Sequence, residues 1–185
     1  KSIKNEKINA TKEIKSLATR KSSELMLNAL TKNNNTLIGG SADLAGSNNT
    51  KTKHHKIIKP NDFGGNYIHY GVREHAMCGI MNGLSLHSKF IPYGGTFMIF
   101  SDYCKPSIRL SAMMKQRVIY VMTHDSIGLG EDGPTHQPIE QLSGLRAIPN
   151  LNVLRPADRT ETIECWELSL KNSSTPSILS LTRQD

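Results

Sequence analysis

Near the start of the chain, apolar and polar positions follow two different periods, which predict a helix and then a strand. Residues 20–32 place apolar side chains at helical spacing behind Ser22 and Ser23, two hydroxyl residues that can cap the start of a helix. The sequence TLIGG at residues 36–40 is a short apolar run that ends in glycines, which is typical of a buried strand.

A long polar stretch follows at residues 41–65, and beyond it strands and helices alternate regularly. A loop of that length in a compact domain is usually functional or disordered. Pro106 falls inside one expected helix and should kink or split it. We expect strands at residues 66–71, 90–96, 117–124, 151–156 and 177–183, and helices at residues 73–88, 97–115, 137–148 and 157–172.

The regular alternation of strands and helices predicts the fold class. Several expected strands are β-branched and apolar, as in the run VIYVM at residues 118–122, and a helical segment separates each strand from the next. A strand of this kind is buried on both faces of a parallel sheet. The pattern therefore indicates an α/β fold, with a doubly wound, mainly parallel sheet and helices on both faces.

This fold class also predicts where a ligand would bind. In open parallel sheets, ligands bind outside the carboxyl ends of the strands, where the strand-to-helix loops gather. One of these loops, THDSIGLGEDGPTHQP at residues 123–138, holds two histidines and three carboxylates. We expect the gathered loops to begin at Ser41, Gly71, Gly94, His124, Arg155 and Arg183.

Length and composition limit the number of domains. A chain of 185 residues fits one ordinary domain with a sizeable core. Residues 1–17 are rich in lysine and are expected to form a basic, solvated arm or linker ahead of a domain at residues 18–185. The first residue is Lys rather than Met, so we expect this chain to be a piece of a longer protein.

The net charge of +7 suits either a polyanion or a small phosphorylated ligand. The basic residues concentrate in residues 1–21 and 51–59, without interleaved aromatic residues, a reading helix or a zinc-finger pattern. We therefore predict no nucleic-acid partner and favour phosphorylated small molecules. His54 and His55 lie in the second basic segment and are expected to be solvated rather than to act as ligands.

Cysteine usage and apolar runs bear on localisation. The three cysteines, Cys78, Cys104 and Cys165, are widely spaced, without a C-x-x-C pair. A reducing compartment is the simpler interpretation, and we expect a cytoplasmic protein. No apolar run approaches the roughly 18 residues that span a bilayer, so we predict no membrane partner.

The sequence of the polar loop does not match three common kinds of site: a hydrolase triad, a metal site and a phosphate-binding loop. The adjacent histidine, aspartate and serine at residues 124–126 cannot reach the geometry of a hydrolase triad, and no G-x-S-x-G elbow exists. The side chains of Glu131, Asp132 and His136 could bind metal, but their spacing matches neither a calcium loop nor a zinc signature. The sequence GLGEDG lacks G-K-[ST], and its carboxylates would repel phosphate. We expect no metal ligand in this chain.

A carboxylate and an aromatic series each allow two interpretations. Glu74 follows an expected strand at a helix start, where the helix dipole alone favours an acidic residue. Phe97, Phe100 and Tyr103 recur every three residues, as a core stripe would. Both features also begin beside a strand end. An acidic group next to an aromatic wall would suit a flat heterocycle whose ring nitrogen takes a proton.

Four stretches, taken together and in this order, resemble one enzyme family. They are IGGSADL, YGVREHAM, PYGGTF and THDSIGLGEDGPTHQPIE, which begin at residues 38, 70, 92 and 123. In this combination the chain resembles the central, pyrimidine-binding domain of transketolase, over residues 18–184 and with the thiamine-diphosphate-binding fold. The long last stretch is specific to transketolase and the related dihydroxyacetone synthase.

The resemblance implies roles for the cofactor-facing residues. Glu74 matches the catalytic glutamate that hydrogen-bonds the ring nitrogen N1′ of the aminopyrimidine of thiamine diphosphate. Phe97, Phe100 and Tyr103 match the aromatic pocket around that ring. Mg²⁺ and the diphosphate are implied to bind a separate domain through a G-D-G motif followed by Asn, which this chain lacks. The implied partner is the diphosphate-binding domain of a second subunit in a homodimer.

The resemblance also implies a substrate site and a reaction. Its substrate-binding residues are Arg20, Ser41, His124, Asp132, His136 and Arg183. In these roles Ser41, Arg20, His124 and Arg183 contact the substrate phosphate. Asp132 bonds the sugar hydroxyl, and His136 is a second catalytic residue beside the carbonyl. The implied reaction, part of the pentose phosphate pathway, transfers a two-carbon ketol unit from a ketose phosphate to an aldose phosphate.

Two other functions stay open on the sequence alone. Dihydroxyacetone synthase is a neighbouring transferase that accepts formaldehyde, and the phosphate-binding residues favour transketolase over it. A non-catalytic relative would keep the fold for interactions only, and the presence of Glu74 with all three pocket aromatics argues against it. The resemblance further implies a fragment that lacks the diphosphate-binding and C-terminal domains and is inactive alone.

Overall fold

The computed structural model describes residues 1–12, 16–32 and 34–185, and its strands form one parallel sheet. Within that described part, the sheet has six strands in the order β2-β1-β3-β4-β6-β5. They are β1 (Leu37–Ser41), β2 (Tyr67–His69), β3 (Ile91–Phe97), β4 (Ile119–Thr123), β5 (Asn152–Leu154) and β6 (Ser177–Leu181).

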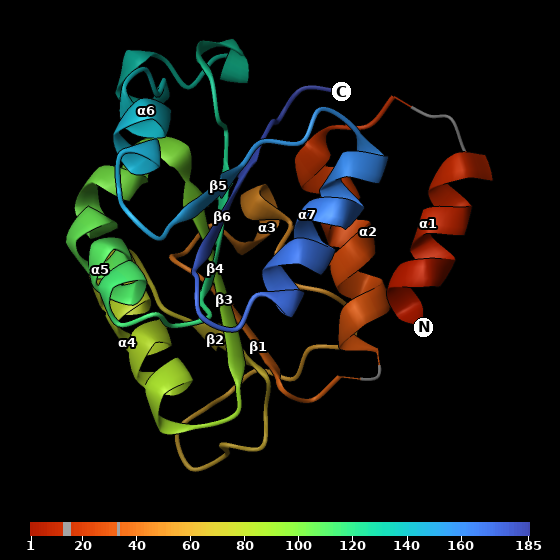
Figure 1. Ribbon diagram of the computed structural model, residues 1–185, viewed down its shortest axis with the longest axis vertical. Coiled ribbons are helices and arrows are strands. Elements are labelled where there is room, and N and C mark those ends of the chain that lie inside the picture. Colours follow the sequence, from red (N-terminus) through yellow and green to blue (C-terminus); the bar gives the residue numbers. More distant parts are fainter. Residues whose placement is uncertain (13–15, 33) are drawn as a thin grey trace.

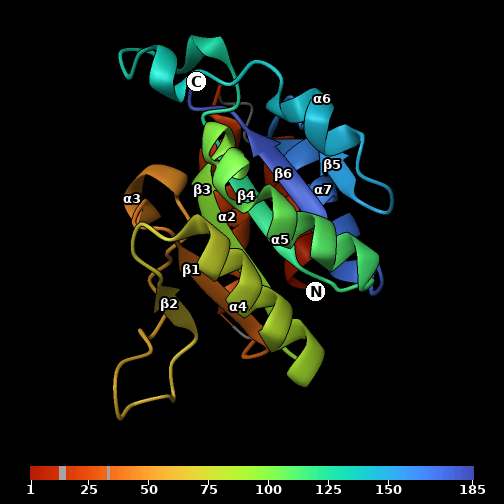
Figure 2. The ribbon, with the colours of Figure 1, turned by 90° about the vertical axis from the view of Figure 1, so that its left-hand side faces the viewer.

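Helices cover both faces of the sheet, as Figure 1 shows. Three helices lie on one face: α1 (Ser2–Lys12), α2 (Thr19–Thr31) and α7 (Arg159–Lys171). On the other face are α4 (Glu74–His87), α5 (Ser101–Met113) and α6 (Gln141–Arg146), with α4 and α5 side by side in Figure 2. The short helix α3 (Ala45–Asn48) lies within the polar stretch after β1. The predicted doubly wound α/β fold is confirmed.

The two-residue period of β4 divides the apolar core into two layers. Tyr120 and Met122 pack with the α4 and α5 side chains, whereas Ile119 and Val121 pack with those of α2 and α7. All four side chains are fully buried. Because both faces of β4 are buried, this fold requires apolar residues at successive positions of the strand. The unbroken apolar run in the sequence therefore predicted a central strand correctly.

Strand register brings the carboxyl ends of the central strands to one level. Ser41 pairs with Gly95, Phe97 with Thr123, and Thr123 with Leu181. The loops that follow β1, β3, β4 and β6 therefore start close together at one edge of the sheet. The register thus produces the gathering of loops that the parallel topology predicted.

Residues 1–12, expected to belong to a solvated arm, instead contribute a packed helix. Lys7 on α1 forms an ion pair with Glu164 on α7 at 2.7 Å, and Arg159 pairs with Glu6 at 3.1 Å. Ala10 is buried against the α2 and α7 core. Ion pairs between residues far apart in sequence leave no periodic signal, so the lysine-rich composition alone suggested a solvated segment.

The capping prediction for α2 is also wrong. The helix begins at Thr19, one turn earlier than expected, so Ser22 and Ser23 lie inside it and are buried. The Ser23 hydroxyl accepts a hydrogen bond from the indole Nε1 of Trp166 at 2.9 Å. Ser23 therefore joins α2 to α7 rather than starting a helix.

Three predicted boundaries differ from the structure. Helix α5 runs through Pro106 without a split, and a 3-10 turn, η1 (Met98–Phe100), precedes it. Gly94 lies inside β3 rather than at a loop start. A Cβ at Gly94 would lie 2.7 Å from the Met81 sulfur, so close packing against α4 explains the glycine. The expected helix at 137–148 shortens to α6.

Candidate functional site

The polar loop after β4 folds over the carboxyl edge of the sheet. It contains two 3-10 turns, η2 (Ile127–Leu129) and η3 (Pro134–His136), and it lies near the C-terminal end of the chain in Figure 1. Two glycines in it, Gly130 and Gly133, adopt positive φ of 106° and 80°, which favours glycine. These turns bring the histidines and carboxylates of the loop over the strand ends.

Glu74 lines a small hollow beside β1 and β3. It is the first residue of α4, is 7% exposed, and accepts a hydrogen bond from Thr96 Oγ1 at 3.5 Å. The positive end of the α4 dipole favours its carboxylate. The hollow has a volume of about 140 Å³ and is lined by Ala42, Asp43, Leu44, Val72, Glu74 and Phe100.

The three predicted pocket aromatics form one stacked series with different exposures. The rings of Phe97 and Phe100 are 5.7 Å apart and nearly parallel at 9°, and Phe100 and Tyr103 are 5.8 Å apart at 23°. Phe97 is buried, whereas Tyr103 is 66% exposed. Only Phe100 shares the hollow with Glu74. The series therefore extends from the buried strand end to the surface, and Phe100 is its member that lines the hollow with Glu74.

His124 follows β4 directly and is held in an unusual conformation. Its φ of +57° is in the left-handed region, which non-glycine residues adopt rarely and often at functional sites. The ring stacks on Phe97 at 3.7 Å, and Nδ1 lies 2.9 Å from the Thr123 hydroxyl oxygen. Burial, followed by the Arg20 charge, lowers the pKa of His124 to about 4. The imidazole is therefore neutral near pH 7.

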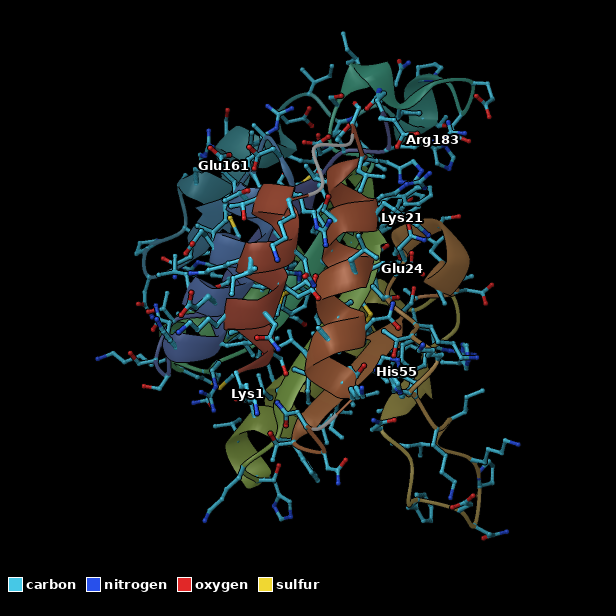
Figure 3. All side chains as sticks on the ribbon, turned by 90° about the vertical axis from the view of Figure 1, so that its right-hand side faces the viewer. Lys1, Lys21, Glu24, His55, Glu161 and Arg183 are labelled. Carbon is cyan, nitrogen blue, oxygen red and sulfur yellow. The ribbon has the colours of Figure 1, made fainter. Side chains whose placement is uncertain are left out.

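Two guanidinium groups lie near His124. Arg20, near the start of α2, donates to the Ser47 carbonyl at 2.9 Å, and burial and then the Arg183 charge lower the pKa of Arg20. Arg183 follows β6 and donates to Glu131 at 3.0 Å; Figure 3 shows it beside the loop that holds η2 and η3. This bond to Glu131 raises the pKa of Arg183. The two cations and the neutral imidazole form a site suited to an anion.

Asp132 and His136 complete the polar side of the site. An Asp132 carboxylate oxygen lies 3.8 Å from an Arg183 nitrogen, and its charge acts on His124. The His136 ring meets Phe100 edge-on at 5.3 Å and 72°. Its Nδ1 lies 2.9 Å from the Thr135 hydroxyl oxygen. The structure therefore brings His124, Asp132, His136, Arg20 and Arg183 together, next to the aromatic series.

Ser41 differs from the other predicted site residues. It is fully buried, and its hydroxyl bonds Asn48 Oδ1 and the Gly95 carbonyl, both at 3.1 Å, while accepting from the Leu44 amide. Its hydroxyl is therefore engaged inside the protein and does not reach the anion site. Ser47, in the short helix α3, contacts Arg20 through its backbone carbonyl.

The resemblance assigned the phosphate contact to Ser41, because no local pattern shows that the Ser41 hydroxyl is engaged inside the protein. The prediction for His55 is corrected as well, since its ring is partly buried. His55 Nδ1 accepts from the Thr52 amide at 2.8 Å, and Nε2 lies 3.0 Å from the Tyr93 hydroxyl. Burial lowers the pKa of His55 to about 4. Figure 3 shows it well away from Arg183, so it anchors the loop rather than serving the site.

Over residues 1–12, 16–32 and 34–185, no group of three or more His, Cys, Asp or Glu side chains could hold a metal ion. Across the same ranges, no helix is both long enough and apolar enough to cross a membrane.

Comparison with known families decides the identity of this arrangement. A family model described as "Transketolase, pyrimidine binding domain" matches residues 15–185. The chain belongs to this family. The predicted resemblance is thus confirmed at the level of the domain, while the predicted boundary between residues 17 and 18 stays a prediction.

Curated relatives carry the same name. Transketolase of Cereibacter sphaeroides is 58% identical over 94% of this chain, and transketolase of Sinorhizobium medicae is 59% identical over 91%. The matches cover 26% and 24% of those two proteins. The chain therefore spans about a quarter of the length of the relatives it matches.

Solved structures agree with the fold. Transketolase from Leishmania mexicana matches 90% of this chain with a TM-score of 0.89 and 51% identity, and 25% of its own length is covered. A structure described as "Split gene transketolase, inactive beta4 tetramer" is 27% identical with a TM-score of 0.72. That match covers 91% of this chain and 52% of the other. A domain with this fold thus also occurs in a chain that is shorter than the Leishmania mexicana transketolase.

Proposed function

We propose that this chain is the pyrimidine-binding part of a transketolase, which transfers a two-carbon ketol unit from a ketose phosphate to an aldose phosphate. One observation supports this most directly. A buried carboxylate, Glu74, lies in a mostly apolar hollow beside Phe100, at the same sheet edge as the anion site of Arg20, His124 and Arg183. Ketol transfer by the full-length protein, with and without thiamine diphosphate, tests it.

The hollow has the chemistry that thiamine diphosphate requires. Its lining combines the apolar side chains of Ala42, Leu44 and Val72 with one ring, Phe100, one buried carboxylate, Glu74, and one exposed carboxylate, Asp43. A flat ring with a basic nitrogen would stack on the aromatic and face the carboxylate. When bound, this cofactor supplies a nucleophilic carbon and takes up the electron pair of the broken C–C bond.

The residues of this chain would handle protons and exclude water. Glu74 would share a proton with the pyrimidine ring nitrogen, and Phe97, Phe100 and Tyr103 would keep water from the ring. His136, packed on the edge of Phe100, would move a proton at the substrate carbonyl oxygen. Asp132 would accept a hydrogen bond from a sugar hydroxyl. Each of these roles requires the residue to lie near the carboxyl ends of the strands.

The anion site would bind the sugar phosphate. Arg20 and Arg183 supply charged donors, Ser47 lies beside Arg20, and the neutral His124 supplies a further donor. A phosphate dianion would compete with Glu131 for the Arg183 guanidinium. This site favours a phosphorylated acceptor, as in transketolase, over formaldehyde, the acceptor of dihydroxyacetone synthase.

Exposed apolar side chains support a partner domain, and the free cysteines support a cytoplasmic setting. The outer faces of α4 and α5 expose Ile80, Leu110 and Met113, an apolar surface that a partner would cover. We infer that it contacts the diphosphate-binding domain of a second subunit in a homodimer. That domain would hold the cofactor's diphosphate and Mg²⁺. The pentose phosphate pathway would use the reaction, and the free thiols of this chain suit a cytoplasmic setting.

Replacing Arg183 tests the phosphate role. In the full-length protein, Arg183→Ala should raise KM for a phosphorylated acceptor about 10- to 100-fold, the scale of hydrogen bonds to a charged group. An unphosphorylated aldehyde should show little change. Arg155→Ala is the matched control, because Arg155 follows the neighbouring β5 but pairs with Asp125 at 2.8 Å. Equal effects of Arg183→Ala on both acceptors would make that arginine structural.

Replacing Asp132 tests the hydroxyl contact. Asp132→Ala should cost about 1–3 kcal/mol of transition-state stabilisation for a hydroxylated donor, the scale of one lost buried hydrogen bond. The measurement is kcat/KM for donors with and without the hydroxyl next to the reacting carbon. An unchanged value for the hydroxylated donor would remove Asp132 from the substrate site.

A further inference from the structure

A buried chain of hydrogen bonds connects the loop after β1 with His124. The Asn48 amide nitrogen donates to Thr123 Oγ1 at 2.7 Å, and that hydroxyl oxygen lies 2.9 Å from His124 Nδ1. Asn48 Oδ1 accepts from the Ser41 hydroxyl at 3.1 Å. All four residues are buried, and Asn48 and Thr123 are fully so. No function proposed above uses either of these two residues.

The direction of the Asn48 bond bears on where the imidazole proton lies. An amide nitrogen can only donate, so Thr123 Oγ1 is the acceptor toward Asn48. The single hydroxyl proton of Thr123 is then available for His124 Nδ1. When Thr123 donates this proton to Nδ1, the neutral ring carries its own proton on Nε2. Within the described residues, Nε2 has no hydrogen-bond partner, so it is free to contact a ligand.

This proton position matches the needs of the anion site. An oxyanion repels a ring nitrogen that presents its lone pair and attracts one that presents N–H. Arg20, Arg183, His136 and Asp132 are the charged and titratable groups that act on His124, so its ring lies within electrostatic range of both guanidinium groups. Its low pKa rules out a second ring proton near pH 7, and the tautomer therefore decides whether Nε2 donates.

We propose that Asn48 and Thr123 are positioning residues for phosphate recognition, which hold His124 as the tautomer with its proton on Nε2. The proposal rests on the function proposed above, since it assigns a ligand-binding role to His124. Ser41, predicted to touch phosphate directly, instead orients the Asn48 amide by donating to its oxygen. Its contribution to the site is thus indirect. The left-handed backbone at His124 turns its ring onto Phe97 and leaves Nδ1 beside Thr123.

Replacing the Thr123 hydroxyl tests the proposal in the full-length protein. Thr123→Val keeps the shape of the side chain but removes its proton donor, whereas Thr123→Ser keeps the donor. Thr31→Val is the matched control, because Thr31 is also buried and its hydroxyl donates to the Leu27 carbonyl on α2. It removes a buried hydroxyl without touching His124.

The first readout is spectroscopic and does not depend on catalysis. In protein labelled with ¹⁵N histidine, the His124 signals, assigned by their loss in His124→Gln, should show a protonated Nε2 and an unprotonated Nδ1. Thr123→Ser and Thr31→Val should keep this signature, and Thr123→Val should lose it. A protonated Nδ1 in the unaltered protein would overturn the proposal.

The second readout is substrate recognition. Thr123→Val should raise KM for a phosphorylated acceptor about five- to tenfold, the effect of one weakened hydrogen bond, without a matching change for an unphosphorylated aldehyde. Thr123→Ser should restore the original KM. Equal losses for both acceptors, or no loss, would overturn the positioning role.

The two proposals can fail separately. If the full-length protein shows no ketol transfer, titration with ribose 5-phosphate still reports on His124 through its ¹⁵N signals. A shift of those signals in the unaltered protein, weakened in Thr123→Val, would support the positioning role without the transferase. If ketol transfer is present but Thr123→Val changes neither the tautomer nor phosphate binding, the positioning role alone is wrong.

Discussion

Glu74→Gln in the full-length protein is expected to lower kcat for ketol transfer by about 10²–10⁴-fold, the range for a positioned proton-transfer group. Gln keeps the size of the side chain and can still meet Thr96, so the packing around the hollow should persist. It cannot accept or share a proton as a carboxylate does. Steady-state kinetics at saturating thiamine diphosphate measures the effect.

A matched substitution separates this role from the helix dipole. Glu161 also lies in the first turn of a helix, α7, where its carboxylate accepts from the Ala157 amide at 2.7 Å. Glu161→Gln should leave kcat unchanged, because that helix start lies outside the site. Full turnover in Glu74→Gln, or an equal loss in both variants, would leave Glu74 as an ordinary acidic residue of the first turn.

The second large effect concerns stability. Trp166→Ala is expected to destabilise the domain by about 3–5 kcal/mol, the usual cost of truncating a fully buried tryptophan. The indole is fully buried, its Nε1 donates to Ser23, and its ring meets Tyr93 edge-on at 5.8 Å. The substitution therefore leaves a cavity between α2, α7 and β3 and removes the partner of Ser23.

Urea unfolding of the 185-residue chain measures this loss. Leu168→Ala on the same helix is the control, since Leu168 is 47% exposed and should change the free energy of unfolding by less than about 0.5 kcal/mol. Similar urea midpoints for Trp166→Ala and Leu168→Ala would show that the buried Trp166 side chain is not essential to the packing of α7.

The fold was predictable because its signals are local and periodic. The apolar run that became β4 had to be buried on both faces, and a helix separates most successive strands, which together require a parallel sheet. The gathering of His124 and Arg183 at one edge followed from the same topology. His124 directly follows β4 and Arg183 follows β6. The pairing of these two strands, in which Thr123 lies opposite Leu181, brings the two residues together.

The features that the sequence did not reveal depend on contacts between distant residues. Helix α1 is held by ion pairs such as Lys7 to Glu164, which no local pattern predicts. The buried role of Ser41 depends on Asn48 and on the Gly95 carbonyl across the sheet. The bond from Asn48 to Thr123 joins residues 75 positions apart. Such contacts become visible only once the strands are in register.

The resemblance and the geometry contributed different information about the site. The motifs suggested roles for individual residues and assigned the phosphate contact to Ser41, which ends β1, rather than to Ser47, which lies in α3. The geometry separates them, since the Ser41 hydroxyl is engaged internally and Ser47 contacts Arg20. It also shows that His124, with a left-handed backbone and a low pKa, is close to two guanidinium groups.

The central claim is that this chain supplies the carboxylate and the phosphate site of a transketolase. Its most direct test is ketol transfer from xylulose 5-phosphate to ribose 5-phosphate by the full-length protein, with and without thiamine diphosphate and Mg²⁺, beside the 185-residue chain alone. We expect activity in the cofactor-loaded full-length protein and none in the isolated chain. No transfer by the loaded full-length protein would contradict the account.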